Sequence, residues 1–323
     1  MDKFFLFLTA GIILLGILLV LCITNPVMSQ KTGNINSDSS LKSNLYRHVK
    51  ELTSSEHARN AYNPEALNKV ADYIMQEFKN LGLHPYEQKY IVDENEFKNI
   101  VCTLGPKDKP LIVIGAHYDV CGDQPGADDN ASGVAGILEL ARLLSKDTTL
   151  KYKIEFVAYT LEEPPYFRTQ NMGSAVHAHS LKENNIEVRA MICLEMIGYF
   201  SEEKGSQSYP TALLKPFYPS KGNFILIVGQ FGETKLVRTF KKGMRNNSRI
   251  DVRSINSPKF VTGVDFSDHL NYWAVGYPAI MITNTSFYRN RNYHEASDTI
   301  ETLNFDKMSE VVAGIYGAVK NLK

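Results

Sequence analysis

The densest group of side chains able to bind a metal or move a proton lies between residues 115 and 133. Four of them share one short polar loop: His117, Asp119, Asp128 and Asp129. An apolar run over residues 111–116 predicts a buried strand before the loop, and residues 134–144 predict a helix after it. Open α/β sheets present ligands in this way, at the carboxyl ends of their strands. Core packing does not require this combination of residues, whereas a divalent metal does.

Similar side chains follow three other predicted strands. These strands cover residues 153–160, 190–194 and 278–283, and they are followed by Glu162 with Glu163, by Glu195, and by His294. Each group alone is weak evidence, because a single histidine is usually hydrogen-bonded and a Glu-Glu pair is usually solvated. Four strand ends that carry such residues at one edge of a sheet predict a metal centre.

Two histidines and at least three carboxylates suit zinc, cobalt or manganese. The number of carboxylates indicates two metals that share one ligand, about 3.5–4 Å apart. In the Glu162-Glu163 pair, one carboxylate can bind metal while the other takes a proton from water. His117 and Asp119 are two residues apart on an extended segment, so Asp119 can accept a hydrogen bond from the second ring nitrogen of His117 and fix its tautomer.

The chain resembles the M28 family of zinc aminopeptidases over roughly residues 41–323. The matching motifs occur in family order: His117-Tyr-Asp119, Gly126-Ala-Asp-Asp-Asn-Ala-Ser-Gly133, Glu162-Glu163, Gly173-Ser174, Glu195-Met-Ile-Gly198, Ser267-Asp268-His269 and Tyr293-His294-x-x-Ser297-Asp298. Together these motifs are highly specific.

The resemblance implies two zinc ions and a role for each matching residue. It implies that Asp129 bridges the metals, that His117 and Glu195 bind different metals, and that Glu163 joins one and His294 the other. Glu162 is then the general base, and a cis peptide follows Asp129. Many members carry Asp where this chain has Glu195, a difference that affects metal spacing or metal choice.

Several neighbouring residues are expected to have supporting roles. Asp128 is expected to cap the following helix or turn the loop. Asp268 and His269 are expected to be structural or to support the ligands, with substrate contact as the lesser alternative. Arg289 and Arg291 are expected to be solvated, with contact to a substrate carboxylate as the alternative. Tyr293 is a lesser candidate for contact with a reaction intermediate. Cys121 is expected to be a small residue near the metals rather than a thiolate ligand, because oxygen and nitrogen donors already suffice.

The wider sequence predicts one α/β catalytic domain over residues 41–323. Strands that alternate with helices favour a three-layer α/β/α sandwich around a mixed, mostly parallel sheet. Lys plus Arg and Asp plus Glu both total 35 among 323 residues, so charge offers no argument for nucleic-acid binding. The four cysteines form no CxxC pair, which argues against a thiolate zinc site. Three of them lie in the folded part, and this odd count argues against a disulfide framework but leaves room for one bridge.

Residues 1–28 read as a signal peptide or a membrane anchor, since residues 4–23 are almost wholly apolar. Residues 29–40 read as a linker. Both interpretations export the catalytic domain to the periplasm or the cell exterior, and membrane contact is expected only through the N-terminal segment. A lipoprotein signal at Cys22 is less favoured, because the preceding Leu21 is not small.

The predicted activity is removal of N-terminal residues from peptides by metal-activated water, with Glu162 as base. Three alternatives remain: a glutaminyl-cyclase-like enzyme with a single zinc, a carboxypeptidase or amidohydrolase, and a non-catalytic binding module. The sequence leaves the substrate side chain and the oligomeric state open.

Overall fold

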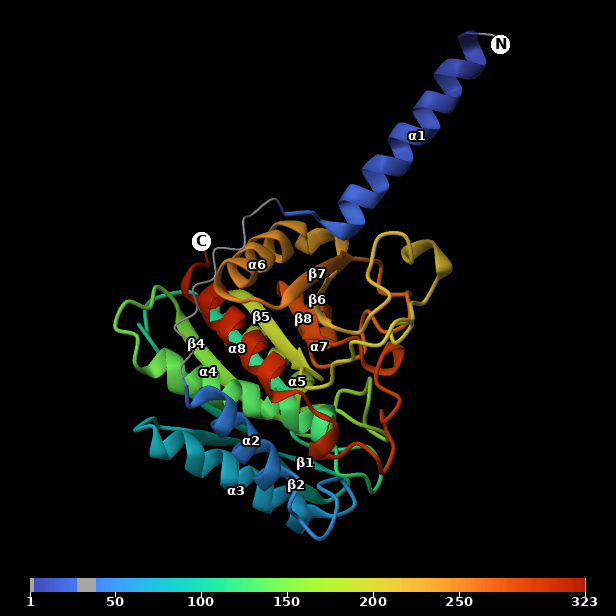
Figure 1. Cartoon of the computed structure of the whole chain (residues 1–323). Helices are drawn as coiled ribbons and strands as arrows, with labels where there is room; N and C mark the ends of the chain where they lie inside the picture. Colours follow the sequence, from blue (N-terminus) through green and yellow to red (C-terminus); the bar gives the residue numbers. More distant parts are fainter. Residues whose placement is uncertain (1–2, 28–38, 323) are drawn as a thin grey trace.

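The computed structural model describes residues 3–27 and 39–322, and its centre is one eight-stranded sheet (Figure 1). The strands, in chain order, are β1 (Tyr86–Val92), β2 (Asn95–Leu104), β3 (Leu111–His117), β4 (Lys153–Tyr159), β5 (Val188–Glu195), β6 (Phe224–Gly229), β7 (Asp251–Asn256) and β8 (Ala279–Thr283). Their order across the sheet is β1-β2-β4-β3-β5-β8-β6-β7. Strands β1 and β2 form an antiparallel pair at one edge.

The four central strands β4, β3, β5 and β8 run parallel to one another. Strand β3 is buried along its whole length, as expected for a strand covered on both faces. The sheet is mixed because β2 pairs antiparallel with β4, and β6 pairs antiparallel with β8. Strand β7 was not predicted; it is a short edge strand whose first residues alternate between partial and full burial.

Helices cover both faces of this sheet and confirm the three-layer α/β/α prediction (Figure 1). One face carries α2 (Leu41–Leu52), α3 (Pro64–Asn80), α4 (Gly133–Ser145), α6 (Thr234–Asn247) and α8 (Phe305–Lys320). The other carries the shorter α5 (Gly173–Glu183) and α7 (His269–Ala274). In α8, the apolar face is buried, since Met308, Val311 and Ile315 are fully enclosed.

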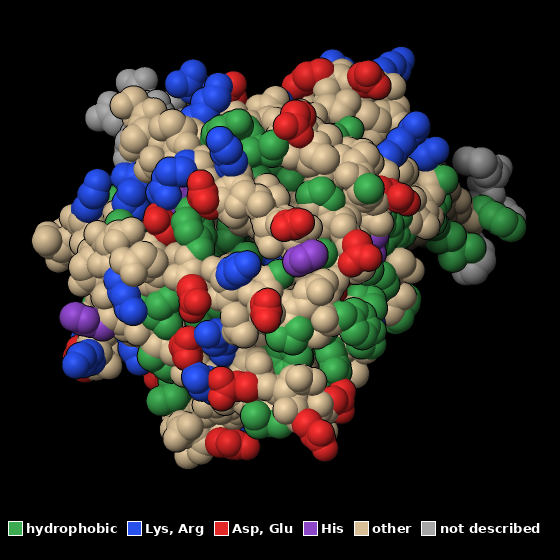
Figure 2. All heavy atoms as spheres, turned by 90° about the horizontal axis from the view of Figure 1, so that it is seen from below, with side chains coloured by type: hydrophobic (Ala, Val, Ile, Leu, Met, Phe, Trp, Pro, Cys, Tyr) green, Lys and Arg blue, Asp and Glu red, His purple; other side chains and the backbone are tan. Residues whose placement is uncertain are grey.

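The segment over residues 201–222 is irregular apart from a short 3₁₀ helix at Ala212–Leu214. Figure 2 shows acidic and basic side chains interspersed across the face seen from below. That face therefore carries no large field of one sign.

The N-terminal apolar segment forms helix α1 (Lys3–Thr24), which projects from the domain (Figure 1). By length and composition alone, residues 7–24 could cross a membrane. The chain leaving this helix is joined to the domain: the Asn25 side chain donates to the carbonyl of Thr234 at 2.7 Å, and the Ser254 hydroxyl donates to the carbonyl of Thr24 at 2.8 Å. Most of the predicted linker lies outside the described residues.

Candidate metal centre

The predicted ligands meet at the carboxyl edge of the four central strands. His117 ends β3 and Glu195 ends β5, and their Nε2 and Oε2 atoms lie 3.4 Å apart. His294 follows β8 by a loop, and its Nε2 lies 3.3 Å from Oε2 of Glu163. Adjacent parallel strands end at the same edge, which explains why residues far apart in the sequence converge here.

Asp129 lies between these two pairs. Its Oδ1 is 3.3 Å from Nε2 of His117, and its Oδ2 is 3.2 Å from Nε2 of His294. One group of donors is therefore His117, Asp129 and Glu195, and the second is Asp129, Glu163 and His294. The predicted central position of Asp129 agrees with this arrangement.

The predicted division of ligands between the metals is wrong. His117 and Glu195 were assigned to different metals, but they face each other on one side of Asp129. Glu163 and His294 likewise lie together on the other side. The reason is topological: β3 and β5 are neighbours, so residues that end these strands reach the same point.

Unusual backbone conformations aim the ligands into the site. The predicted cis peptide is present between Asp129 and Asn130. Leu161, Met196 and His294 have φ values of 58°, 49° and 58°, in the left-handed region that non-glycine residues seldom adopt. Each lies at or beside a ligand or the proposed base, as expected where a site imposes the backbone conformation.

Asp119 holds the segment that carries both glutamates. Its Oδ1 accepts the backbone N–H of Glu162 at 3.2 Å, and its Oδ2 accepts that of Glu163 at 3.1 Å. The Nδ1 atom of His117 is 3.4 Å from the Asp119 carboxylate but makes its hydrogen-bond contact, at 3.2 Å, with the Asp119 backbone carbonyl. Asp119 therefore orients His117 through its backbone and the glutamates through its side chain.

Asp128 is structural, although it does not cap the following helix. Its carboxylate accepts the backbone N–H groups of Gly198 and Tyr199 at 2.9 and 3.1 Å, and the side-chain amides of Asn284 and Asn290 at 2.8 Å each. It therefore ties the loops after β5 and β8 to the metal-binding loop.

Sequence reasoning missed three residues that support the ligands. Ser267 donates to Oε2 of Glu195 at 2.6 Å. Asp298 accepts the N–H groups of Asp128 and Asp129. The buried Arg59 side chain donates to the carbonyls of Tyr118 and Gly126 and so stabilises the metal-binding loop. Ser267 and Asp298 lie within the recognised motifs, whereas Arg59 has no local signal in the sequence.

The charged groups of the site favour binding of a cation. Burial raises the pKa of Glu162 well above its usual range, and it raises the pKa of Glu163, beside Asp129, to about 7. Burial acts to lower the pKa of His294, but the carboxylates of Asp129 and Glu163 raise it to about 10. Uncompensated carboxylates packed out of water explain these shifts.

The unpartnered atoms fit bound metal. Nε2 of His117, Oδ2 of Asp129 and Nε2 of His294 are buried and make no hydrogen bond within the described residues. Nitrogen and carboxylate donors in this mixture suit zinc. The residues present therefore fit the metals that the sequence motifs imply.

An apolar cleft of about 1190 Å³, including its solvent-open part, adjoins the ligands. The cleft is lined by acidic and histidine side chains of the site, namely Asp129, Glu162, Glu163, Glu195 and His294. Its other lining side chains include Phe167, Tyr218, Phe266 and Met281. No Lys or Arg lines it among the described residues.

The arginines after β8 do not face this cleft. Arg289 is 4% exposed and donates to Gln207 and to the carbonyl of Phe224, so it is not the solvated residue that was predicted. Arg291 is exposed and does not line the cleft. Asp268 and His269 are buried, and a ring nitrogen of His269 contacts the carbonyl of Val264 at 2.8 Å, which agrees with a structural role for His269. Both carboxylate oxygens of Asp268 are buried and make no hydrogen bond within the described residues, so its role stays a prediction.

The sequence model of peptidase family M28 matches residues 99–319. The chain belongs to this family. This M28 member is 47% identical to the uncharacterized protein YfbL of Escherichia coli (strain K12), over 86% of this chain and 88% of YfbL. It is 26% identical to leucine aminopeptidase 1 of Blastomyces gilchristii (strain SLH14081), over 83% of this chain and 67% of that protein.

Two solved structures share the fold of this chain. The Legionella pneumophila LapA aminopeptidase aligns with a TM-score of 0.67 at 23% identity, over 91% of this chain and 77% of LapA. The Bacteroides thetaiotaomicron glutaminyl cyclase bound to N-acetylhistamine aligns with a TM-score of 0.66 at 17% identity, over 87% of this chain and 98% of the cyclase. These similarities support the α/β architecture. The reaction has to be inferred from the residues of the site.

Proposed function

We propose that the protein is a two-zinc aminopeptidase that removes apolar N-terminal residues from peptides. The observation that carries this proposal is the position of Asp129 between two donor groups, with Glu162 close by and an apolar cleft alongside. Family membership supports peptide hydrolysis, and two donor groups that share one carboxylate are typical of hydrolytic two-metal sites.

Each metal would have three protein ligands from the donor groups. His117, Asp129 and Glu195 would hold one, and Asp129, Glu163 and His294 the other. When bound, the metals polarise the substrate carbonyl and lower the pKa of water. Asp119 and Ser267 then have positioning roles, because they hold Glu163 and Glu195 in place.

Glu162 is the proposed general base. Its side chain is 8% exposed, its Oε2 lies 3.9 Å from Nε2 of His117, and its carboxylate lies within 4.8 Å of donor atoms of both His117 and Glu163. Burial raises its pKa, which favours a carboxyl group that accepts a proton from water and returns it to the leaving amine. The hydrogen bond from its backbone to Asp119 fixes its position.

The cleft supports substrates with a free amine and an apolar side chain. Its wall is largely aromatic and aliphatic, and the metal centre beside it would offer a binding position for the unprotonated form of a free amine. A carboxypeptidase would need a cation for the substrate's terminal carboxylate. Arg289, the candidate to bind that carboxylate, is buried, so it does not support a carboxypeptidase.

The test combines elemental analysis of the full chain with a panel of amino-acid amides, each with a free or an acetylated amine. We expect two zinc ions per chain and cleavage of the free amines only, fastest for Leu and Phe amides. One zinc with cyclisation of N-terminal glutamine would overturn the proposal in favour of a cyclase. Cleavage of the acetylated series would favour an amidohydrolase.

Glu162→Gln tests the role of the base. Activity should fall at least about 100-fold, because a carboxamide cannot accept the proton. Metal content should stay near the wild-type value; loss of metal would instead make Glu162 a ligand.

We infer that α1 is retained as a membrane anchor for an exported catalytic domain. The hydrogen bonds of Thr24 and Asn25 with the domain support this inference over cleavage as a signal peptide, because they join the end of the helix to β7 and α6. N-terminal sequencing of protein from the membrane fraction is the test: a chain that begins near residue 29 would contradict it.

A further inference from the structure

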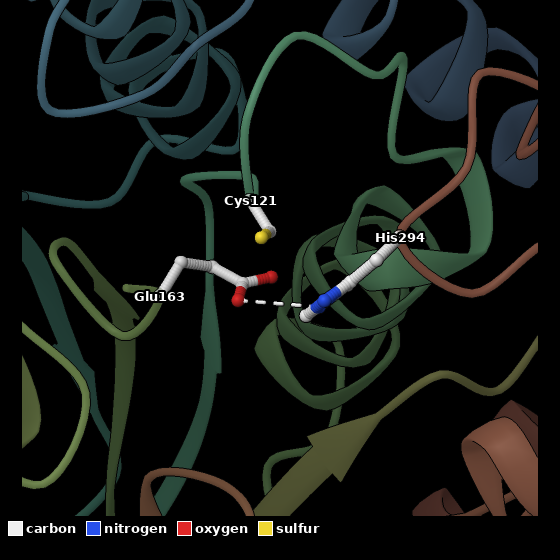
Figure 3. A group of neighbouring side chains, drawn as sticks. All are labelled: Cys121, Glu163 and His294. Atoms are coloured by element: carbon white, nitrogen blue, oxygen red, sulfur yellow. Dashed lines mark ion pairs between the residues drawn. The ribbon is translucent and has the colours of Figure 1, made fainter. Parts of the chain in front are cut away.

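Cys121 lies beside one half of the metal centre. Its Sγ, a carboxylate oxygen of Glu163 and a ring nitrogen of His294 all lie within 4.8 Å of one another. Figure 3 shows the three side chains pointing toward one shared space, each from a different segment of the chain. The thiol is half-buried, so it has access to that space without being sealed in the core.

A second observation marks the same space as a ligand position. The Asp129 side chain is 3% exposed, and its Oδ2 has no hydrogen-bond partner in the described part of the chain. This oxygen is 3.2 Å from Nε2 of His294, which also makes no hydrogen bond in the described part of the chain. The two atoms form an ion pair with each other, and a ring nitrogen of His294 lies in the same group of possible metal donors as Sγ of Cys121.

The other cysteines have different settings. Cys22 lies on the exposed surface of α1, and Cys102 is buried within β2. Cys193 is buried and contacts the Ser267 hydroxyl at 3.1 Å. Within the described residues, the group of His117, Asp129 and Glu195 includes no sulfur. Any sulfur ligand would therefore belong to one metal alone.

We propose that Cys121 is a thiolate ligand of the metal held by Asp129, Glu163 and His294. This inference rests on the proposed function, because it requires that metal. On binding, the S–H bond breaks, a sulfur–metal bond forms and the proton passes to solvent, with no change in oxidation state. Cysteine thiolate is a good zinc ligand, and its softness favours zinc or cobalt over manganese or magnesium.

The geometry changes the interpretation that the sequence suggested. Oxygen and nitrogen donors supply three ligands here, and a catalytic zinc keeps a further position for water. Cys121 would add a fourth protein donor to the His294 metal, which would then be five-coordinate when water is also bound. The two metals are then chemically distinct: one with nitrogen and oxygen ligands only, and one that also carries sulfur.

The test is the absorption spectrum of the full chain loaded with cobalt. A sulfur-to-cobalt charge-transfer band in the near ultraviolet is expected in the wild type and in Cys22→Ser, the matched control. Cys121→Ser should lose that band while it keeps the visible cobalt bands of the remaining ligands. Zinc at this position should also bind at least about 10-fold more weakly in Cys121→Ser, a loss no smaller than that of a supporting residue.

X-ray absorption of the wild-type zinc protein keeps the proposal testable if Cys121→Ser does not fold. We expect a sulfur neighbour at about 2.3 Å in addition to nitrogen and oxygen. Visible cobalt bands without a charge-transfer band, or a band that survives in Cys121→Ser, would overturn the role of Cys121 and leave the metal centre intact. A folded protein that binds no metal would overturn the proposed function as well.

Discussion

The two halves of the metal centre are built in different ways. His117 and Glu195 end neighbouring strands, and their side chains are 1% and 8% exposed. His294 lies on a loop after β8, its side chain is 26% exposed, and its ring stacks on Tyr293 at 3.8 Å. The first half is thus part of the sheet's packing, whereas the second is attached to it beside the cleft. We expect substitutions in the first half to affect folding as well as activity.

His117→Ala and His294→Ala compare the halves directly, and both should abolish activity. In chelator-treated protein, His117→Ala should lower the free energy of unfolding by about 3 kcal/mol or more, because it leaves buried carboxylates without their counter-charge. His294→Ala should cost only about 1 kcal/mol, because the His294 side chain is 26% exposed and water can reach the carboxylates of Asp129 and Glu163 once the ring is removed. Urea unfolding measures both values, and equal losses would break the comparison.

Asp119→Asn tests the residue that links the halves. An amide nitrogen would face one of the two backbone N–H groups that the carboxylate now accepts, so the segment that carries Glu162 and Glu163 should shift. We expect kcat to fall about 100-fold, the typical effect of a small displacement of reacting groups. Asp123→Asn, an exposed change in the same loop, is the control. A similar fall in kcat for Asp123→Asn would show that the effect does not depend on the hydrogen bonds of Asp119.

His269 is buried, and its titration should make the stability of the folded protein depend on pH. Burial lowers its pKa to about 4, whereas an unfolded histidine titrates near 6.5. Between these values the unfolded chain binds more protons, so stability should decrease as pH falls from 6.5 to 4. At pH 5 the loss is about 2 kcal/mol. Urea unfolding of metal-free His269→Gln should show a correspondingly flatter profile; an unchanged profile would contradict the assignment.

Ser267→Ala should give the smallest effect. It removes the 2.6 Å hydrogen bond on Glu195 but no ligand. We expect about 10-fold weaker binding of one metal, typical of the loss of a supporting partner. Chelator competition measures this affinity, and Ser309→Ala on the exposed side of α8 is the control. Unchanged affinity would show that packing alone holds Glu195.

Much of this site was predictable because its ligands follow strong local patterns. The apolar runs that became β3, β4 and β5 end beside His117, Glu162 and Glu195. Strand β7 was missed because a short edge strand has little apolar signal. Arg59 was missed because its partners are backbone carbonyls more than fifty residues away, which leave no trace in nearby sequence.

Sequence alone determined the α/β class, the apolar N-terminal helix and the identity of the candidate ligands, because periodicity and motif spacing are local properties. Tertiary structure decided which ligands face each other. It paired His117 with Glu195 because β3 and β5 are adjacent, and it turned Arg289 into the interior. It also brought Cys121 to the side of Asp129 occupied by Glu163 and His294, which spacing along the chain could not reveal because the three come from separate loops.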